Sequence, residues 1–311
     1  MFDAPPANPQ SVGDVIGRGF RLLRQHIPLM VREQIVPCII MATGHSLFQF
    51  AVTYGLKNPK DLPMLGAGLL AILLGTLTVV LGFWFLTIKL FAFVRLACGL
   101  AVNFEEAKQA ALKRKWNILG FYLLTSMIIC AAIVFWLIVM VLPVIAFSKV
   151  PAIAVSGMLI GLAGLIVSAG LISVYYGLTN AALAIEEDRW LTLIKRASAL
   201  VTNDLGRACG FAILLSVIVS VLSYTLSLPI VALAVFELFR SGFPANHADP
   251  TTAMPFYLLV LSQFWQAMIN MFLLPISFMS GGLFYRDLKI RQEGLDVVQR
   301  IKQLTAVGAR Q

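Results

Sequence analysis

The residues of this chain best suited to chemistry are uncharged polar side chains inside long apolar stretches. A polar group is costly in lipid, so it either bonds a neighbouring helix or serves a solute. Two of these stretches carry a polar stripe at helical spacing and a third carries one deep amide. We call these residues the polar set: His45 and Gln49; Gln263, Gln266 and Asn270; and Asn180.

The polar set admits two interpretations. One is a polar cavity or pathway that accepts a solute between spans one, four and six. The other is hydrogen bonding between helices, which contributes about 0.6 kcal/mol for each bond in a membrane. The spacing is compatible with both, and the sequence leaves the choice open.

Motifs for enzymatic chemistry are scarce. The chain has no HExxH, GxSxG or Walker loop, and its four cysteines form no CxxC pair, so we expect no disulfide. Its histidines, His26, His45 and His247, fall in different segments and are not expected to converge. Acidic residues 186–188 are expected to pair with neighbouring Arg and Lys. We therefore predict no enzymatic activity, no cofactor and no metal site.

Six long apolar stretches must position these residues. The chain is 59% hydrophobic and only 13% charged, whereas soluble domains carry roughly 25% charged residues. A span needs about 20 apolar residues, and each stretch is long enough to cross once. We predict an all-α polytopic membrane protein with spans within 34–56, 62–88, 116–148, 150–185, 208–236 and 250–285. Small residues at Gly157 and Gly161 form a GxxxG pattern that predicts close helix packing, within one chain or between two.

Positive charge lies mainly on one side of these stretches. Only four Lys and Arg residues are assigned to the opposite side: Lys57, Lys60, Lys149 and Arg240. The positive-inside rule then places both termini in the cytoplasm. The net charge of +9 is consequently interpreted as contact with anionic headgroups, with no nucleic-acid partner.

The cytoplasmic segments show amphipathic helical patterns, spaced about 90 residues apart, over 12–27, 104–112 and 190–205. Ser11 is placed to cap the first, with Asp14 three residues on. We predict three pseudo-repeats, each a basic amphipathic interfacial helix followed by two spans. The alternative is that any basic loop before a span looks similar. The cations expected to contact lipid headgroups are Arg18, Arg21, Lys113, Arg114, Lys195 and Arg196.

A polar string follows the last span directly. The residues that characterise this string are Tyr285, Arg286, Asp287, Arg291, Glu293 and Gly294. It resembles the closing motif of a bacterial six-span family that occurs alone and as the membrane domain of some glycerophosphodiester phosphodiesterases. The resemblance implies a bacterial inner-membrane location. We expect one membrane domain over 1–311, with a flexible tail at 1–10 and a cytoplasmic helix at 286–311; the soluble barrel of such an enzyme, about 250 residues, is not expected.

Two functional hypotheses follow. The first is a non-enzymatic integral membrane protein that engages anionic lipid or supports a membrane complex, with a protein partner or a second copy of the chain as further partners. The second is a transporter of a lipid or small molecule that uses the polar set.

Overall fold

The protein is described by a computed structural model that covers residues 9–55, 62–146, 151–240 and 255–293. These residues form helices and connecting turns, without strands. Six of the helices are long and apolar enough to cross a membrane. The chain is therefore an integral membrane protein of the all-α class, as the sequence predicts.

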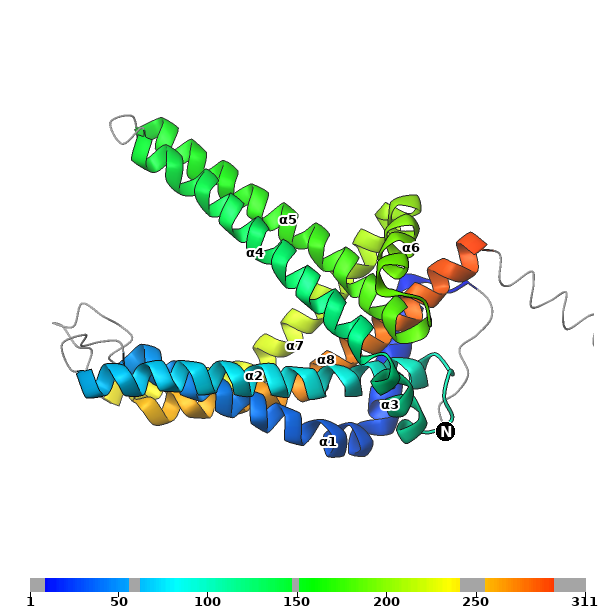
Figure 1. Ribbon diagram of the computed structural model, residues 1–311, viewed down its shortest axis with the longest axis horizontal. Coiled ribbons are helices and arrows are strands. Elements are labelled where there is room, and N and C mark those ends of the chain that lie inside the picture. Colours follow the sequence, from blue (N-terminus) through cyan, green and yellow to red (C-terminus); the bar gives the residue numbers. More distant parts are fainter. Residues whose placement is uncertain (1–8, 56–61, 147–150, 241–254, 294–311) are drawn as a thin grey trace, which may run out of the picture. The chain divides into compact units, whose positions relative to one another are not determined.

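The helices follow the predicted order (Figure 1). Two are short, namely α3 (Phe104–Lys113) and α6 (Trp190–Asn203). The long ones are α1 (Val12–Phe50, continued by a π-helical turn at Ala51–Gly55), α2 (Leu62–Ala97), α4 (Lys115–Ala146), α5 (Pro151–Ile185), α7 (Leu205–Arg240) and α8 (Phe256–Glu293). The last span was predicted to end at Tyr285, but α8 continues unbroken to Glu293. The three predicted outer turns lie largely outside the described residues.

Helix α1 is kinked at His26, which has non-helical backbone angles of φ −122° and ψ 20°. Pro28 follows two residues later, and a proline ring disrupts the preceding turn and removes one backbone donor. The kink separates the amphipathic segment of α1 from its apolar part. Each of three successive groups therefore consists of one short amphipathic segment followed by two long apolar helical segments. Repetition of one unit stays a prediction.

Helix α3 begins with a side-chain cap. The Asn103 side-chain oxygen accepts from the Glu106 backbone N–H at 2.9 Å, and the Glu106 carboxylate accepts from the Val102 N–H at 3.0 Å. The first bond satisfies a donor that the first helical turn leaves open, and the second ties the Glu106 side chain to the residue before the cap. The apolar side of α3 then buries Phe104 and Ala107 inside the protein.

Helix α6 also buries its apolar stripe in protein. Leu193, Ala197 and Val201 are fully buried, and α6 packs against α5 and α4. Much of the apolar surface of α3 and α6 is thus occupied by protein contacts, while Leu112 and Leu191 remain exposed. Membrane contact by these helices is left to their exposed sides.

The chain divides into two compact units. The first unit comprises Met1–Val15, Val94–Leu214 and Ser280–Gln311. The second unit comprises Ile16–Phe93 and Leu215–Met279. Helix α8 contributes its C-terminal part to the first unit and the rest to the second.

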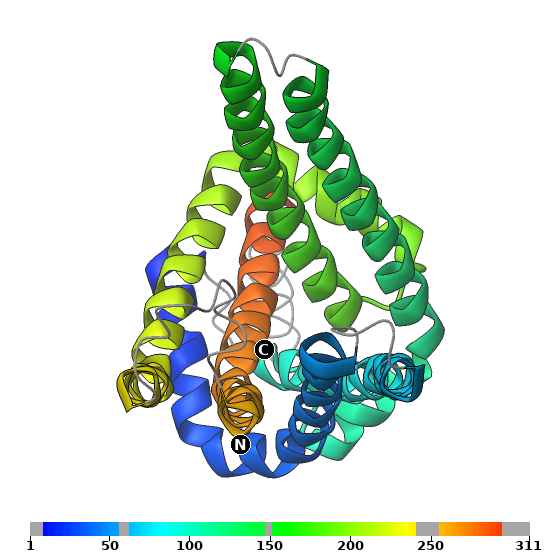
Figure 2. The same cartoon turned by 90° about the vertical axis from the view of Figure 1, so that its left-hand side faces the viewer.

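In the first unit, α4 and α5 run side by side as a hairpin (Figures 1 and 2). A Cβ at Gly157 would lie 2.5 Å from the Pro143 ring, and one at Gly164 would lie 2.1 Å from the Trp136 ring. The Trp136 indole N–H donates to Ser168 Oγ at 2.8 Å. The small residues therefore pack two helices of one chain together. No residue in the most apolar stretch of α4 is buried, so this hairpin requires lipid or another apolar partner around it.

In the second unit, α1 and α2 also approach closely through glycine. A Cβ at Gly44 would lie 2.8 Å from the Gly75 carbonyl oxygen, and one at Gly82 would lie 2.6 Å from the Met41 side chain. The core beside this crossing contains residues from α1, α2 and α8: Cys38, Leu86, Leu90 and Met271. Cys38 and Leu86 of this core line the same cavity as polar residues of α1 and α8.

Candidate functional site

A cavity of about 100 Å³ lies among α1, α2 and α8 in the second unit. Four members of the polar set line it: His45 from α1 and Gln263, Gln266 and Asn270 from α8. Its apolar lining is supplied by Cys38, Met41, Ala42, Leu86, Ala267 and Leu274. The structure thus brings two stripes together that lie more than 200 residues apart in the sequence.

Hydrogen bonds fix how these polar groups are presented. Gln266 Nε2 donates to Asn270 Oδ1 at 3.2 Å. His45 Nδ1 lies 2.8 Å from the Met41 carbonyl oxygen. A carbonyl only accepts, so this contact requires a proton on Nδ1 and leaves Nε2 as an acceptor in the neutral ring.

The lining suits an uncharged polar solute. Amides provide both donors and acceptors, and the His45 ring offers Nε2 as a further hydrogen-bonding atom. Among the described lining residues there is no Asp, Glu, Lys or Arg. A charged solute would therefore find no side chain of opposite charge in this lining.

Two members of the polar set are placed elsewhere. Gln49 lies one turn beyond His45, is half-buried, and is not among the residues that line the cavity. Asn180 belongs to the first unit, where its oxygen accepts from the Tyr122 hydroxyl at 3.0 Å and its nitrogen donates to the Tyr176 carbonyl at 3.0 Å. Asn180 therefore links α4 to α5, which is the helix-bonding interpretation of this residue.

The first unit holds a buried carboxylate at the C-terminal end of α5. Glu186 accepts from the Tyr285 hydroxyl, Lys289 Nζ and Arg196 Nη1, each at 2.7 Å. We call these four residues the Glu186 cluster. Burial raises the pKa of Glu186, but hydrogen bonds from Lys289 and Tyr285, with the charge of Lys289, outweigh it and hold the pKa below its ordinary value.

Two arginines donate hydrogen bonds to carbonyl groups at the same end of α5. Arg95 donates to the Ala184 carbonyl at 3.1 Å, and Arg114 donates to the carbonyls of Leu183 and Asp188. The last carbonyls of a helix lack partners within the helix and carry negative partial charge. The cations therefore satisfy and stabilise this helix end.

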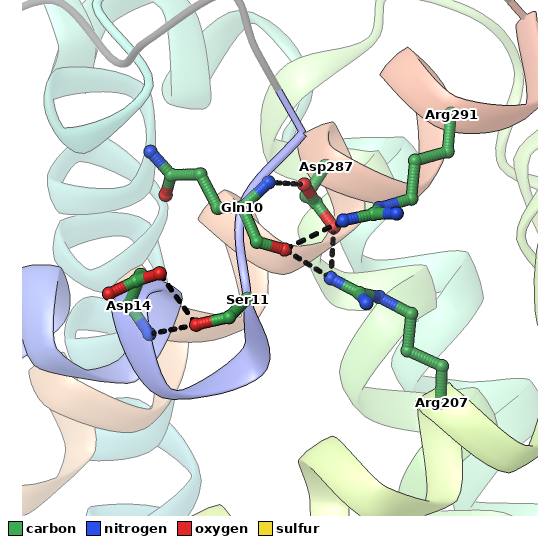
Figure 3. A network of polar contacts seen from close by, with 6 residues as sticks. All are labelled: Gln10, Ser11, Asp14, Arg207, Asp287 and Arg291. Carbon is green, nitrogen blue, oxygen red and sulfur yellow. Dashed lines mark hydrogen bonds and ion pairs between the residues drawn. The ribbon is translucent and has the colours of Figure 1, made fainter.

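A second carboxylate, that of Asp287, binds the backbone just before α1 (Figure 3). Asp287 accepts from the Gln10 backbone N–H at 2.7 Å, from Arg207 at 2.7 Å and from Arg291 at 3.1 Å. Both arginines also donate to the Gln10 carbonyl. We call these four residues the Asp287 cluster. Its contacts hold Gln10, the last residue of the predicted flexible tail.

The expected cap of α1 is adjacent to this cluster (Figure 3). Ser11 Oγ accepts from the Asp14 backbone N–H at 3.1 Å and donates to the Asp14 carboxylate at 2.6 Å. The sequence therefore located the start of α1 correctly, and the Asp287 cluster fixes the residue before it.

The six cations predicted to meet lipid have different surroundings. Arg21, Lys113 and Lys195 are exposed, and Arg18 is half-buried. Arg114 and Arg196 are committed to contacts within the first unit. The three exposed cations are available for headgroups without rearranging the protein.

The residues of the C-terminal string act mainly as internal contacts. Tyr285 and Asp287 belong to the two clusters described above, and Arg286 donates to the Cys98 carbonyl at 2.6 Å. Glu293 ends α8. Gly294 and His247 lie outside the described residues. Within the described residues, no group of three or more His, Cys, Asp and Glu is placed to hold a metal ion.

Sequence reasoning overlooked Gln34, a fully buried amide on α1. Its signal was available, since it precedes Cys38 and His45 on one helical face.

Comparisons with family models, with curated proteins and with solved structures found no match to this chain.

Proposed function

We propose that this integral membrane protein binds a small polar solute in the cavity among α1, α2 and α8 and passes it across the membrane without chemical change. One observation carries the proposal: His45, Gln263, Gln266 and Asn270 converge on one cavity. If these side chains served only to bond helix to helix, they would have no reason to share an open space.

Flux through reconstituted vesicles tests the proposal. Proteoliposomes placed in glycerol or urea should swell faster than vesicles without protein. Asn270→Leu should abolish the difference, because it removes an amide from the cavity. Gln49→Leu is the matched control, since it removes a half-buried amide outside the lining. Equal loss in both variants, or no swelling above empty vesicles, would contradict transport of such solutes.

A second candidate function is engagement of anionic lipid or support of a membrane complex. The exposed cations Arg21, Lys113 and Lys195 favour it, and so does the apolar α4–α5 hairpin. Each cation near an anionic surface contributes about 1 kcal/mol. Reversal of all three to Glu removes this attraction and adds repulsion, so binding to anionic vesicles should weaken by at least about a hundredfold. Binding that does not distinguish anionic from zwitterionic vesicles would exclude the headgroup role.

The matched control for this experiment reverses two cations of the other kind. Arg114→Glu and Arg196→Glu should reduce stability, because each residue contacts groups within the first unit. If these variants instead lost lipid binding while remaining folded, the assignment of internal and external cations would be reversed.

The proposed location is the bacterial inner membrane with both termini in the cytoplasm. It is supported by the distribution of Lys and Arg and by the resemblance of the string around Tyr285 to the six-span family. Cysteines introduced at 57–63, 147–151 or 240–252 should react with an impermeant thiol reagent in intact cells. Labelling at Gln109→Cys or Thr202→Cys instead would overturn this orientation.

A further inference from the structure

We infer that the cavity continues along α1 to Gln34, which provides a second hydrogen-bonding position for the same uncharged solute. This inference rests on the proposed function and adds a route and a ligand class to it. The route would run from His45 past Cys38 to Gln34.

Gln34 is the observation that points to a ligand. Its side chain is fully buried, yet neither its amide oxygen nor its amide nitrogen has a hydrogen-bond partner among the described residues. Buried amides are nearly always satisfied, because an unpaired donor or acceptor loses its bonds to water without replacement. A molecule that both donates and accepts would satisfy this side chain.

The geometry of α1 connects Gln34 to the cavity. Gln34, Cys38 and His45 follow one another at helical spacing on one face, and Cys38 and His45 line the cavity. At 1.5 Å per residue, Gln34 lies about 6 Å along the axis from Cys38. Val31, on the same face, packs against the core cluster that contains Cys38. The amide therefore lies one turn beyond the described end of the cavity.

The next residue along α1 beyond Gln34, moving away from the cavity, is the charged residue Glu33. Lys89 Nζ lies 3.6 Å from the Glu33 carboxylate and also donates to the Glu33 carbonyl. Both side chains are mostly buried, at 18% and 13% exposed. This ion pair marks the end of the route, which the charge distribution of the chain assigns to the cytoplasmic side.

The ligand class follows from the groups along the route. From His45 to Gln34 the described polar side chains are amides, an imidazole and a thiol. They match hydroxyl- or amide-bearing solutes, which donate and accept at once. The cavity of about 100 Å³ has room for a handful of water-sized positions, so the solute is expected to have fewer than ten heavy atoms.

Thiol modification of the full-length protein tests the route. Methanethiosulfonates react with thiolates, and a thiol ionises readily only where water reaches it. The test protein carries Gln34→Cys with Cys38, Cys98, Cys130 and Cys209 replaced by alanine. The control keeps native Cys98 alone, which is also fully buried, at 1% exposed, but belongs to the first unit.

A hydrated route predicts modification of Gln34→Cys at least tenfold faster than of Cys98, with protection by millimolar to molar glycerol. Equal rates would overturn the route. A protein retaining only native Cys38 provides a second measurement that needs no change at Gln34. Cys38 lines the described cavity, so fast modification of Cys38 beside a Gln34→Cys rate equal to that of Cys98 would overturn the continuation to Gln34. A Cys38 rate equal to that of Cys98 would overturn the hydrated cavity from which the route starts. Fast modification without solute flux would retain the route but remove the proposed transport, so the two failures are distinguishable.

Discussion

The Tyr285 hydroxyl donates to Glu186 Oε1 at 2.7 Å and joins α8 to the end of α5. Tyr285 is fully buried, and Glu186 is 8% exposed. A hydrogen bond to a charged group contributes about 1.5–3 kcal/mol when the acceptor cannot reach water instead. This pair therefore stabilises the first unit.

Tyr285→Phe should lower the free energy of unfolding by about 2 kcal/mol, because the carboxylate loses one of three donors. Thermal unfolding in detergent measures the loss. Tyr257→Phe is the matched control: Tyr257 also donates to a carboxylate, that of Glu237, at 2.5 Å, but its side chain is 56% exposed. The Glu237 side chain is itself only 11% exposed, so an effect at Tyr257 as large as that at Tyr285 would show that burial of the tyrosine is not the cause.

Glu186 also predicts a dependence of stability on pH. Its pKa in the folded protein lies below the ordinary value near 4.5, so folding favours the ionised form. The stabilisation is fully present above pH 4.5 and is lost as the pH falls through the folded pKa. The difference in unfolding temperature between the native protein and Glu186→Gln should thus shrink below pH 4.5. A difference that grew with acid would contradict the assignment.

The helices were largely predictable because each has a local cause. Long apolar runs, the Ser11 cap, the break at Pro28 and the small residues from Gly157 are readable from neighbouring residues. Even the short amphipathic helices were located, since their apolar faces repeat at helical spacing. Their environment was not predictable, because the same face suits lipid and protein equally.

The site was predictable only in part. His45 and Asn270 were correctly selected as polar residues in spans, but their meeting in one cavity depends on tertiary packing. The partners of Glu186 and Asp287 lie as far as 103 and 277 residues away, and no local pattern encodes such pairs. Arg114 and Arg196 looked the same as the exposed cations in sequence, although the fold uses them internally.

The Asp287 cluster predicts that the start of the chain is held in place. Asp287→Asn removes the charge shared by Arg207 and Arg291, and should destabilise the protein by roughly 2 kcal/mol. Hydrogen exchange at the Gln10 amide should accelerate, because its acceptor at 2.7 Å is a carboxylate oxygen. Asp14→Asn is the control, since Asp14 bonds only locally to Ser11 among the contacts described. Unchanged exchange at Gln10 in Asp287→Ala, which leaves no side-chain acceptor, would show that this bond does not protect it.

The α4–α5 hairpin predicts opposite outcomes for two glycines of α5. A Cβ at Gly164 would lie 2.1 Å from the rigid Trp136 ring, whereas one at Gly170 meets no atom within 4 Å. Gly164→Ala should therefore cost about 1–3 kcal/mol through overpacking. Gly170→Ala should be neutral or stabilise by up to about 1 kcal/mol, because alanine favours the helix. Unfolding by denaturing detergent compares the two variants.

The cause of the Gly164 effect can be separated from a general loss of helix packing. Trp136→Leu removes the ring that the new methyl group would meet, together with its bond to Ser168 at 2.8 Å. Adding Gly164→Ala to that variant should cost much less than adding it to the native chain, which a double-mutant cycle quantifies. If the two costs were equal, the methyl group would be opposed by something other than Trp136. A small cost in the second background is expected, because the ring is the nearest group to the added carbon.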